Sequence, residues 1–465
     1  MAEARATQGN SGAAPSLRRE LGLWAAVSIV VGTVIGSGIF LVPKTMVANV
    51  GSPSLVFLVW VFGGVLSLAG ALTYAELAAA LPEAGGEYVY LRAAYGPMWA
   101  FIYGWTQMWV AKSGSIATLA TAFFYYLANF YPQLEGTLAT LPLPVGPGGA
   151  PLEIRYGQVL AMAVILLLAW INYFGVRFGG DVQIVVTVIK VVLIGAVIAI
   201  GLTASQATVA NLGTSAPAPV GGIAGFFAAL VAALWAYDGW NNVAMVSSEI
   251  KDPQRNLPRA LILGTLGVIA IYLLANAAYF LVLSSTEVAT TNRVAAEMMR
   301  KVMGSFGAGA VSLAAMISIF AALNGSILTG ARVPYAMARD GLFFRAIGEV
   351  HPRWFTPANS IVAMSTWAAL LVLSGRYEQL FTYVIFSSWI LYGMATASVI
   401  VLRRKRPDLV RPYRTLGYPV VPVLFVLVAA ALLVSTLQSS PRESLMGIGI
   451  ILAGLPFYRY WRQRV

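Results

Sequence analysis

Apolar stretches of about 20 residues, separated by short polar segments, follow one another along almost the whole chain. A helix of that length and composition crosses the hydrocarbon core of a bilayer. The pattern therefore predicts an all-α polytopic membrane protein with twelve transmembrane helices. We expect these spans at residues 22–49, 54–81, 97–130, 157–175, 180–203, 222–249, 259–284, 304–334, 358–374, 379–402, 418–438 and 444–460.

Two of the predicted spans are interrupted by residues that weaken a helix. The first span contains Gly36-Ser37-Gly38, and the sixth contains the turn-forming pair Asp238-Gly239. Unpaired backbone groups in hydrocarbon cost several kcal/mol each, so such breaks persist only where protein or a polar cavity surrounds them. Interrupted spans at corresponding positions of two halves indicate the substrate site of a secondary transporter.

Spans 1–5 and spans 6–10 each begin with an interrupted helix, which indicates an internal repeat. Because each repeat has an odd number of spans, the two would insert in opposite orientations and form an inverted repeat. We expect an N-terminal tail at 1–20, the first repeat at 21–205, the second at 206–403, two further helices within 404–460, and a C-terminal tail at 461–465.

The composition excludes an ordinary soluble protein, since 59% of residues are apolar, only 10% are charged, and the mean hydropathy is +0.77. A net charge of +12 is also found in nucleic-acid-binding proteins. Here, however, most of the 30 Lys and Arg residues fall in segments on the same side of the membrane as the N-terminus. Positive residues favour cytoplasmic loops, so we expect both termini in the cytoplasm and a multi-pass protein of the plasma (inner) membrane. The basic excess would attract anionic lipid, not nucleic acid.

Candidate enzyme chemistry is sparse. The chain has no cysteine, which excludes disulfides, thiolate catalysis, thiolate metal sites and a disulfide-linked partner subunit. The single histidine, His351, has no cluster of carboxylates near it in the sequence, and no Gly-x-x-x-x-Gly-Lys-Ser/Thr phosphate loop is present. We therefore expect neither an enzyme nor an ATP-driven pump, and no cofactor or metal.

The glycines of the first span allow two interpretations. An unwound Gly36-Ser37-Gly38 would expose backbone amides and the N-terminus of a second half-helix that continues through Ile39, a site suited to a carboxylate. Alternatively, Gly32-x-x-x-Gly36 would serve only for close helix packing.

The aspartate of the sixth span needs a partner, because a charged residue at this depth costs about 2.5–3.5 kcal/mol on insertion scales. We expect Asp238 to cap the amides of Asn241 and Asn242, leaving the neighbouring backbone free to contact a ligand. Three aromatic residues beside this break are expected to form walls or a gate: Trp235, Tyr237 and Trp240.

Polar residues in other spans add further candidates. Lys190 lies halfway along the fifth span, where an ammonium group indicates a function. It could bind the carbonyls released at the first break, in place of a structural Na⁺, or it could take up and release a proton. In the eighth span, Asn324 and Ser326 either hydrogen-bond another helix or line the pathway. No role is assigned to Lys112.

Four motifs carry a resemblance to a known family. They are residues 31–40 (VGTVIGSGIF), residues 74–77 (YAEL) followed by 82–91 (PEAGGEYVYL), residues 235–242 (WAYDGWNN) continuing into 249–258 (EIKDPQRNLP), and residues 324–332 (NGSILTGAR). In these motifs the chain resembles the amino acid–polyamine–organocation (APC) superfamily, and within it the L-type amino acid transporter (LAT) family. The resemblance covers about residues 20–400.

The resemblance implies a LeuT-type 5+5 inverted-repeat fold with discontinuous helices 1 and 6, and a substrate site between them at the membrane midplane. The substrate carboxylate would bind at Gly36, Ser37, Gly38 and Ile39. The substrate amine and the gate would involve Ile35, Trp235, Ala236, Tyr237, Asp238 and Gly239. Lys190 would take the place of a sodium ion, and the pathway or its surroundings would include Trp240, Asn241, Asn324 and Ser326.

The function implied is Na⁺-independent, obligatory exchange of neutral L-amino acids by alternating access. Two alternatives stay open: H⁺-coupled symport with Lys190 as the titrating group, and a non-transporting amino acid sensor, for whose signalling domain the short tails leave little room. Animal members join a heavy chain through an extracellular cysteine, which is absent here. The resemblance thus implies a stand-alone bacterial transporter, a monomer or weak homodimer. Asp238 stands where several animal relatives have glycine, which leaves the preferred side chain open.

Overall fold

The computed structural model describes residues 16–142, 151–373, 377–439 and 441–463, and most of them are helical. The first half of the chain forms α1 (Leu23–Val34), α2 (Gly38–Val50), α3 (Pro53–Ala80), α4 (Glu87–Tyr95), α5 (Pro97–Thr106), the π-helix η1 (Gln107–Ala111), α6 (Lys112–Leu127), the 3-10 helix η2 (Pro132–Glu135), the strands β1 (Thr137–Leu141) and β2 (Leu152–Arg155), α7 (Tyr156–Tyr173) and α8 (Val176–Thr203).

The second half begins with the 3-10 helix η4 (Val209–Gly213). It continues with α9 (Gly222–Tyr237), α10 (Asn242–Met245), the 3-10 helix η5 (Ser247–Glu249), α11 (Pro253–Val282), α12 (Ser285–Thr290), α13 (Val294–Gly330), α14 (Arg332–Arg339), the 3-10 helix η6 (Arg345–Gly348), α15 (Ala358–Val372), α16 (Tyr377–Lys405), α17 (Val420–Ser439) and α18 (Pro441–Arg462).

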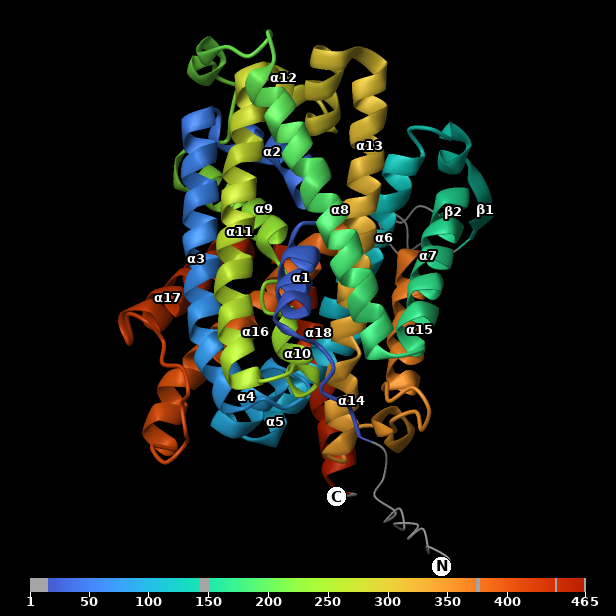
Figure 1. Cartoon of the computed structure of the whole chain (residues 1–465), viewed down its shortest axis with the longest axis vertical. Helices are drawn as coiled ribbons and strands as arrows, with labels where there is room; N and C mark the ends of the chain where they lie inside the picture. The colour runs from blue at the N-terminus through green and yellow to red at the C-terminus, as the bar shows by residue number, and fades with distance from the viewer. Residues whose placement is uncertain (1–15, 143–150, 374–376, 440, 464–465) are drawn as a thin grey trace, which may run out of the picture.

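The predicted all-α polytopic membrane fold is confirmed. Within the described residues, seven helices are long and apolar enough to cross a bilayer, and the bent pair α1–α2 makes an eighth candidate. The total of twelve spans agrees with this arrangement but stays a prediction, because the remaining candidates include shorter helices such as α9 and α15. The described N-terminal segment and the end of α18 lie at the same end of the bundle (Figure 1).

Three predicted elements differ from what the structure contains. The third span is not one regular helix, since η1 interrupts it between α5 and α6. The eighth begins at the expected position, because α13 consists of two helices joined at a kink at Gly304, whose φ of 68° is non-helical; the helix over 294–303 that precedes the kink was not expected. The long connection before α7 contains an antiparallel hairpin of β1 and β2, which was not expected, and residues 143–150 within it lie outside the described residues.

Local sequence signals fix the turn between α2 and α3. Gly51 ends α2 with φ of 84°, a left-handed conformation that glycine adopts without strain. Ser52 then caps α3 by accepting a hydrogen bond from the Leu55 amide, and Pro53 occupies the first helical position, where no amide hydrogen is needed. The turn reverses the chain so that α3 runs along the outside of the bundle (Figure 1).

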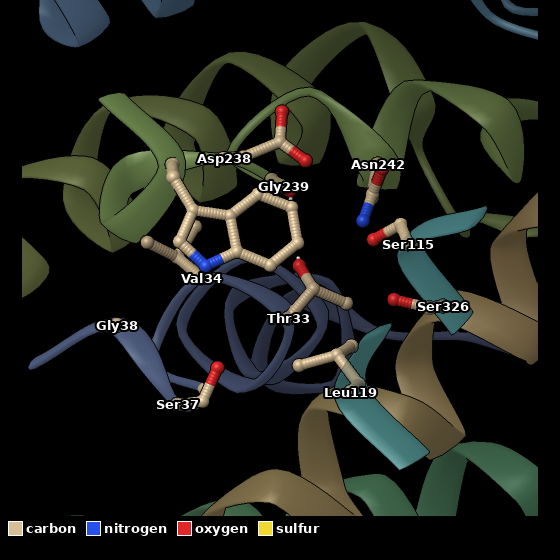
Figure 2. A pocket seen from close by; sticks show the side chains of 12 residues that line it. Thr33, Val34, Ser37, Gly38, Ser115, Leu119, Asp238, Gly239, Asn242 and Ser326 are labelled. Atoms are coloured by element: carbon tan, nitrogen blue, oxygen red, sulfur yellow. Dashed lines mark hydrogen bonds between the residues drawn. The ribbon is translucent and has the colours of Figure 1, made fainter. Parts of the chain in front are cut away.

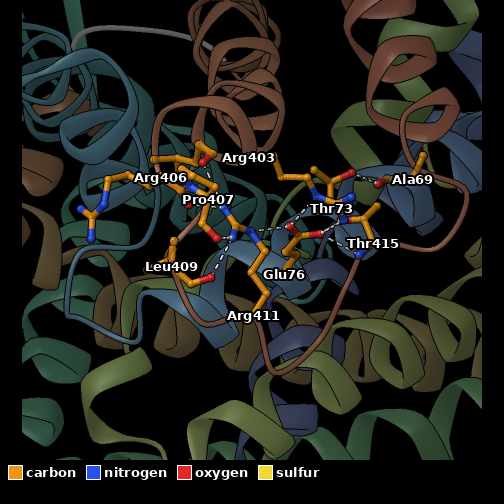
Figure 3. A network of polar contacts seen from close by, with 10 residues as sticks. Ala69, Thr73, Glu76, Arg403, Arg406, Pro407, Leu409, Arg411 and Thr415 are labelled. Carbon is orange, nitrogen blue, oxygen red and sulfur yellow. Dashed lines mark hydrogen bonds and ion pairs between the residues drawn. The ribbon is translucent and has the colours of Figure 1, made fainter.

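A buried carboxylate anchors the connection between α16 and α17. Glu76 of α3 lies 2.6 Å from Nη2 of Arg403 and 3.3 Å from Nε of Arg411. Its Oε2 also accepts hydrogen bonds from the amide and hydroxyl of Thr415, at 2.7 and 2.8 Å. Figure 3 shows these groups converging on the one carboxylate. The described contacts of the Glu76 carboxylate are thus all with other residues of the protein. Glu76 lies in the last part of α3, and none of these contacts is with an interrupted helix.

Candidate functional site

The first predicted break lies where the glycines indicate. Helix α1 ends at Val34, and α2 begins at Gly38 with its axis turned by 41°. The amide of Gly36 turns back to Val34 O at 2.8 Å, so it no longer pairs with Gly32 O four residues earlier. The first amides of α2 have no partner in their own helix, which makes this end of the break a favourable position for an anion.

The second break separates α9 from the short α10. Asp238 is extended (φ −61°, ψ 142°), and Gly239 has φ of +108°, a conformation that strains any residue with a side chain. Space is restricted as well, since a Cβ at Gly239 would lie 3.1 Å from Oγ1 of Thr33. The Thr33 hydroxyl donates to Gly239 O at 2.9 Å, which joins the two breaks directly (Figure 2).

Two further contacts hold the breaks together. A Cβ at Gly38 would lie 2.6 Å from Cα of Ala236, so the backbones of α2 and α9 touch and glycine is required there. The hydroxyl of Tyr272, on α11, lies 2.9 Å from Val34 O and 2.7 Å from Ala236 O, the carbonyls at the ends of α1 and α9. No pattern around Tyr272 in the sequence predicted this bridge, because it depends on how α11 packs.

A cavity of about 20 Å³ lies between the breaks, with room for about one water molecule. Seven predicted site residues line it: Gly36, Ser37, Gly38, Trp235, Asp238, Gly239 and Ser326. Five more lining residues were not predicted: Thr33, Val34, Ser115, Leu119 and Asn242. Figure 2 shows side chains from both breaks and from α6 and α13 around this space. An amino acid is larger than the cavity, so its admission requires side chains or half-helices to move.

Other predicted site residues contact protein instead of the cavity. Tyr237 donates its hydroxyl to Trp60 O at 3.2 Å and packs against the rings of Trp60 and Tyr272. Trp240 is buried edge-on against Tyr74, with ring centroids 4.8 Å apart. Neither of these two residues lines the cavity, so of the three aromatic residues only Trp235 does, and their contact with a ligand stays a prediction. Ile35, Ile39, Ala236 and Asn241 are buried in the breaks but do not line the cavity.

The expected role of Asp238 as a helix cap needs correction. Its carboxylate accepts hydrogen bonds from the Tyr392 hydroxyl of α16, at 3.0 Å, and from the Gly239 amide. No bond from this carboxylate to the amides of Asn241 or Asn242 occurs among the described contacts. The extended backbone at Asp238 turns the side chain away from α10, and a hydroxyl from a distant helix satisfies it instead.

Lys112, which the sequence left without a role, is a buried partner of the second break. Its Nζ donates to Oδ1 of Asn242 at 2.6 Å, and its charge interacts with the carboxylates of Asp238 and Glu87. Glu87, at the start of α4, accepts hydrogen bonds from the side chain of Asn241 and from the hydroxyl of Tyr103. The break therefore lies within a buried network of two carboxylates and one ammonium group.

Lys190 reaches the first break from α8. Its Nζ donates to Gly32 O at 2.8 Å, to Ser318 O at 3.0 Å, and to Ile35 O. The Ser318 hydroxyl also donates to Ile35 O at 3.0 Å. A carbonyl oxygen only accepts, so three carbonyl partners match the three hydrogens of an ammonium group.

Asn324 and Ser326 divide between the two interpretations offered for the eighth span. Asn324 accepts from the Asn172 side chain at 2.8 Å and donates to Oε1 of Gln183 at 2.9 Å, so it joins α13 to α7 and α8. Ser326 lines the central cavity. The same helix thus supplies a structural hydrogen-bond network and part of the cavity wall.

Comparisons with known proteins agree with this architecture. Residues 21–455 match the family model described as amino acid permease. The chain is similar to the b(0,+)-type amino acid transporter 1 of Mus musculus, with 33% identity over 97% of this chain and 91% of the relative. It is similar to the serine/threonine exchanger SteT of Bacillus subtilis, with 33% identity over 96% of this chain and 98% of the relative. It is also similar to the Asc-type amino acid transporter 1 of Mus musculus, with 31% identity over 97% of this chain and 83% of the relative. Together with the paired helix breaks, these matches establish that the chain belongs to the amino acid permease family.

Proposed function

We propose that this protein exchanges neutral L-amino acids across the membrane by alternating access, without Na⁺. The observation that carries the proposal is the pair of helix breaks around one cavity. At that cavity the amide end of α2 meets the carbonyl end of α9, so closely that a Cβ on Gly38 would lie 2.6 Å from Cα of Ala236. An amino acid presents the complementary groups, a carboxylate and an ammonium, two bonds apart.

The substrate carboxylate binds at the first break. Gly36, Ser37 and Gly38 line the cavity, and Gly38 begins a helix of 13 residues, whose N-terminus favours negative charge. The substrate ammonium binds at the carbonyl end of α9, next to Asp238. Trp235 lines the same cavity from α9 and acts as the gate.

The cavity wall favours a small, neutral side chain. Four hydroxyl-bearing residues and one amide line the space, and a substrate hydroxyl could bond to them: Thr33, Ser37, Ser115, Ser326 and Asn242. The negative charge of Asp238 is offset by the Tyr392 hydroxyl and by the nearby charge of Lys112, which removes the reason to require a cationic side chain. A bacterial relative named as a serine/threonine exchanger supports the same substrate class.

Na⁺ independence follows from Lys190. Its ammonium donates to three carbonyls around the end of α1, where a bound cation would otherwise be needed to neutralise them. A neutral amine would have only two hydrogens for these three acceptors. This geometry favours a permanently charged lysine over the alternative, H⁺-coupled symport with Lys190 as the titrating group.

Proteoliposomes test the proposal. Purified protein would be reconstituted without Na⁺, and uptake of labelled serine followed with and without unlabelled serine inside. We expect uptake only into loaded vesicles, unchanged by added Na⁺ or by an inward proton gradient. Uptake into empty vesicles that rises with the proton gradient would instead establish H⁺ symport, and binding of serine without any uptake would establish a sensor.

We further propose that the protein works without a disulfide-linked subunit, as a monomer or weak homodimer in a bacterial inner membrane. The absence of cysteine from the sequence supports the lack of a disulfide-linked subunit, and the similarity to a Bacillus subtilis relative supports a bacterial origin. The arrangement of Lys and Arg supports cytoplasmic termini. Modification of single cysteines introduced at Arg18 and Arg462 by a membrane-impermeant reagent would test the orientation, since neither should react in intact cells.

A further inference from the structure

A second cavity, of about 400 Å³, opens at the turn between α7 and α8, far from the interrupted helices. Its wall combines the segment before α1, the start of α8, and the connection between α14 and α15. The positive residues Arg18, Arg177 and Arg353 come one from each of these segments. The amino acid transport mechanism uses none of them.

Within the part of the chain that the structure describes, none of these three guanidinium groups forms an ion pair with a carboxylate. Among the described contacts, Arg18 lies over the Phe355 ring at 3.4 Å and Arg353 over the Trp354 ring at 4.6 Å, while Arg177 is exposed. Glu20 and Asp181 also line the cavity, so the side chains leave a net charge of about +1. Arginines held on aromatic faces keep their N–H edges available for an anion.

The N-terminus of α8 adds to this positive potential. The helix has 28 residues, and Gly175 before it has no side chain to cap the first amides. The Gly179 amide donates to Gly175 O at 3.1 Å. The amides of residues 176–178, which come before it, therefore have no hydrogen-bond acceptor within the helix. An uncapped helix end beside three arginines is suited to a phosphate group.

An apolar surface leads from the cavity to the lipid-facing side of the bundle. Phe178 lines the cavity and is 52% exposed, and Trp170, further along α7, is 61% exposed. The rings of Trp170, Phe174 and Trp354 follow one another edge to face, with centroids 5.0 and 5.3 Å apart. Aromatic residues of this kind lie at the level of lipid headgroups.

We propose that this cavity binds the phosphate of an anionic phospholipid of the cytoplasmic leaflet, with the acyl chains along Trp170 and Phe178. The distribution of Lys and Arg assigns this end of the bundle to the cytoplasm, where basic pockets between helices bind anionic headgroups. A free phosphate would satisfy the arginines equally well but would leave the exposed aromatic surface unused. The bound headgroup links the segment before α1 to α8 and to the connection after α14.

The test is lipid retention by the full-length protein in nanodiscs and by native mass spectrometry. Phosphatidylglycerol would be compared with phosphatidylcholine, and inorganic phosphate used as a soluble competitor. The double substitution Arg177→Gln with Arg353→Gln removes two of the three positive groups. Arg404→Gln with Arg462→Gln is the matched control, because it removes the same charge from two exposed residues outside the cavity.

We expect the wild-type protein to retain phosphatidylglycerol, and the cavity variant to bind it about 30-fold more weakly, with the control unchanged. If the cavity variant and the control lost the same affinity for phosphatidylglycerol, the lipid would be held by non-specific electrostatic attraction to the protein surface, and the proposal would be overturned. So would displacement by millimolar phosphate, which indicates a free-anion site, or equal retention of the two lipids. If the double variant has a lower melting temperature than the wild type in the absence of lipid, the single Arg353→Gln variant replaces it. Its affinity for phosphatidylglycerol is expected to fall about fivefold.

Discussion

Replacing Lys190 with methionine tests whether a fixed positive charge at the first break is needed for exchange. Methionine fills a similar volume and removes the three hydrogen bonds to Gly32 O, Ile35 O and Ser318 O. The loss of the Lys190 donor affects these three carbonyl oxygens to different degrees. Ser318 O lies within α13 and keeps its helical partner, and Ile35 O keeps the hydroxyl of Ser318 at 3.0 Å.

Gly32 O is the acceptor that would be left without a donor. The Gly36 amide, which would pair with it in a continuous helix, instead donates to Val34 O. A buried carbonyl without a partner costs about 1–3 kcal/mol, while the removal of a buried charge returns part of the desolvation energy. We therefore expect little change in overall stability, but a shift away from the unwound geometry that corresponds to about a 5- to 100-fold loss of exchange.

The assay is serine counterflow in proteoliposomes, with thermal melting of the same preparations. Lys44→Met is the matched control, because Lys44 bonds only to the side chain of Asn292 in an exposed position. The wild-type rate should be constant across neutral pH, since the ammonium has no need to release its proton. Normal exchange by Lys190→Met would refute the fixed-charge reasoning, and so would a pH-dependent wild-type rate that becomes pH-independent in the variant.

Four further predictions follow from the contacts around the two breaks. Gly38→Val should prevent correct folding as well as binding, because its Cβ would lie 2.6 Å from Cα of Ala236; a monodisperse variant with a normal melting temperature would contradict this. Trp235→Ala should lower the exchange rate more than the amount of protein in the membrane, and unchanged counterflow would remove this residue from the gate. Tyr272→Phe removes the hydroxyl donor to Ala236 O, while Val34 O keeps the Gly36 amide, and should cost about 1–3 kcal/mol, measured by thermal melting. Glu76→Gln weakens the anchor of the α16–α17 connection and should cost about 1.5–3 kcal/mol, so a variant that melts with wild type would show the ion pairs to be dispensable.

The arrangement of long helices was predictable because it depends on local sequence. Glycines within an apolar run predicted the bend between α1 and α2, and Asp238-Gly239 predicted the end of α9 within a residue. The helix over 294–303, before the kink at Gly304, was missed because it is too short and too polar to be recognised as a membrane span. The composition of this segment does not predict the π-helical turn η1. A π-helical turn is a local irregularity within a longer helix, here between α5 and α6, and it leaves the apolar pattern of the span unchanged.

The partners of the site residues could not be predicted, because they come from helices that are distant in the sequence. The polar pairs of Asp238 with Tyr392 and of Lys112 with Asn242 span 154 and 130 residues. Periodicity shows that such side chains face the interior but does not fix the rotation of one helix against another. Lys190 was the exception, since an isolated charge midway along a span has few acceptors other than carbonyls freed at a break.

The contacts at the end of α1 decide which movements of the bundle are permitted. Tyr272 and Thr33 join the two breaks, so α1 and α9 cannot separate without breaking the hydrogen bonds from these hydroxyls to Ala236 O and Gly239 O. Opening toward the end of the bundle that holds the termini must also disturb the pair Glu249–Arg332, whose side chains are both fully buried at 2.7 Å. Either charge left alone in the interior costs about 3–5 kcal/mol. If the substrate's own charged groups offset that cost by bonding to the two breaks, the loaded protein reorients and the empty one does not. This asymmetry is the physical condition for obligatory exchange, and uptake into empty proteoliposomes would show that it fails.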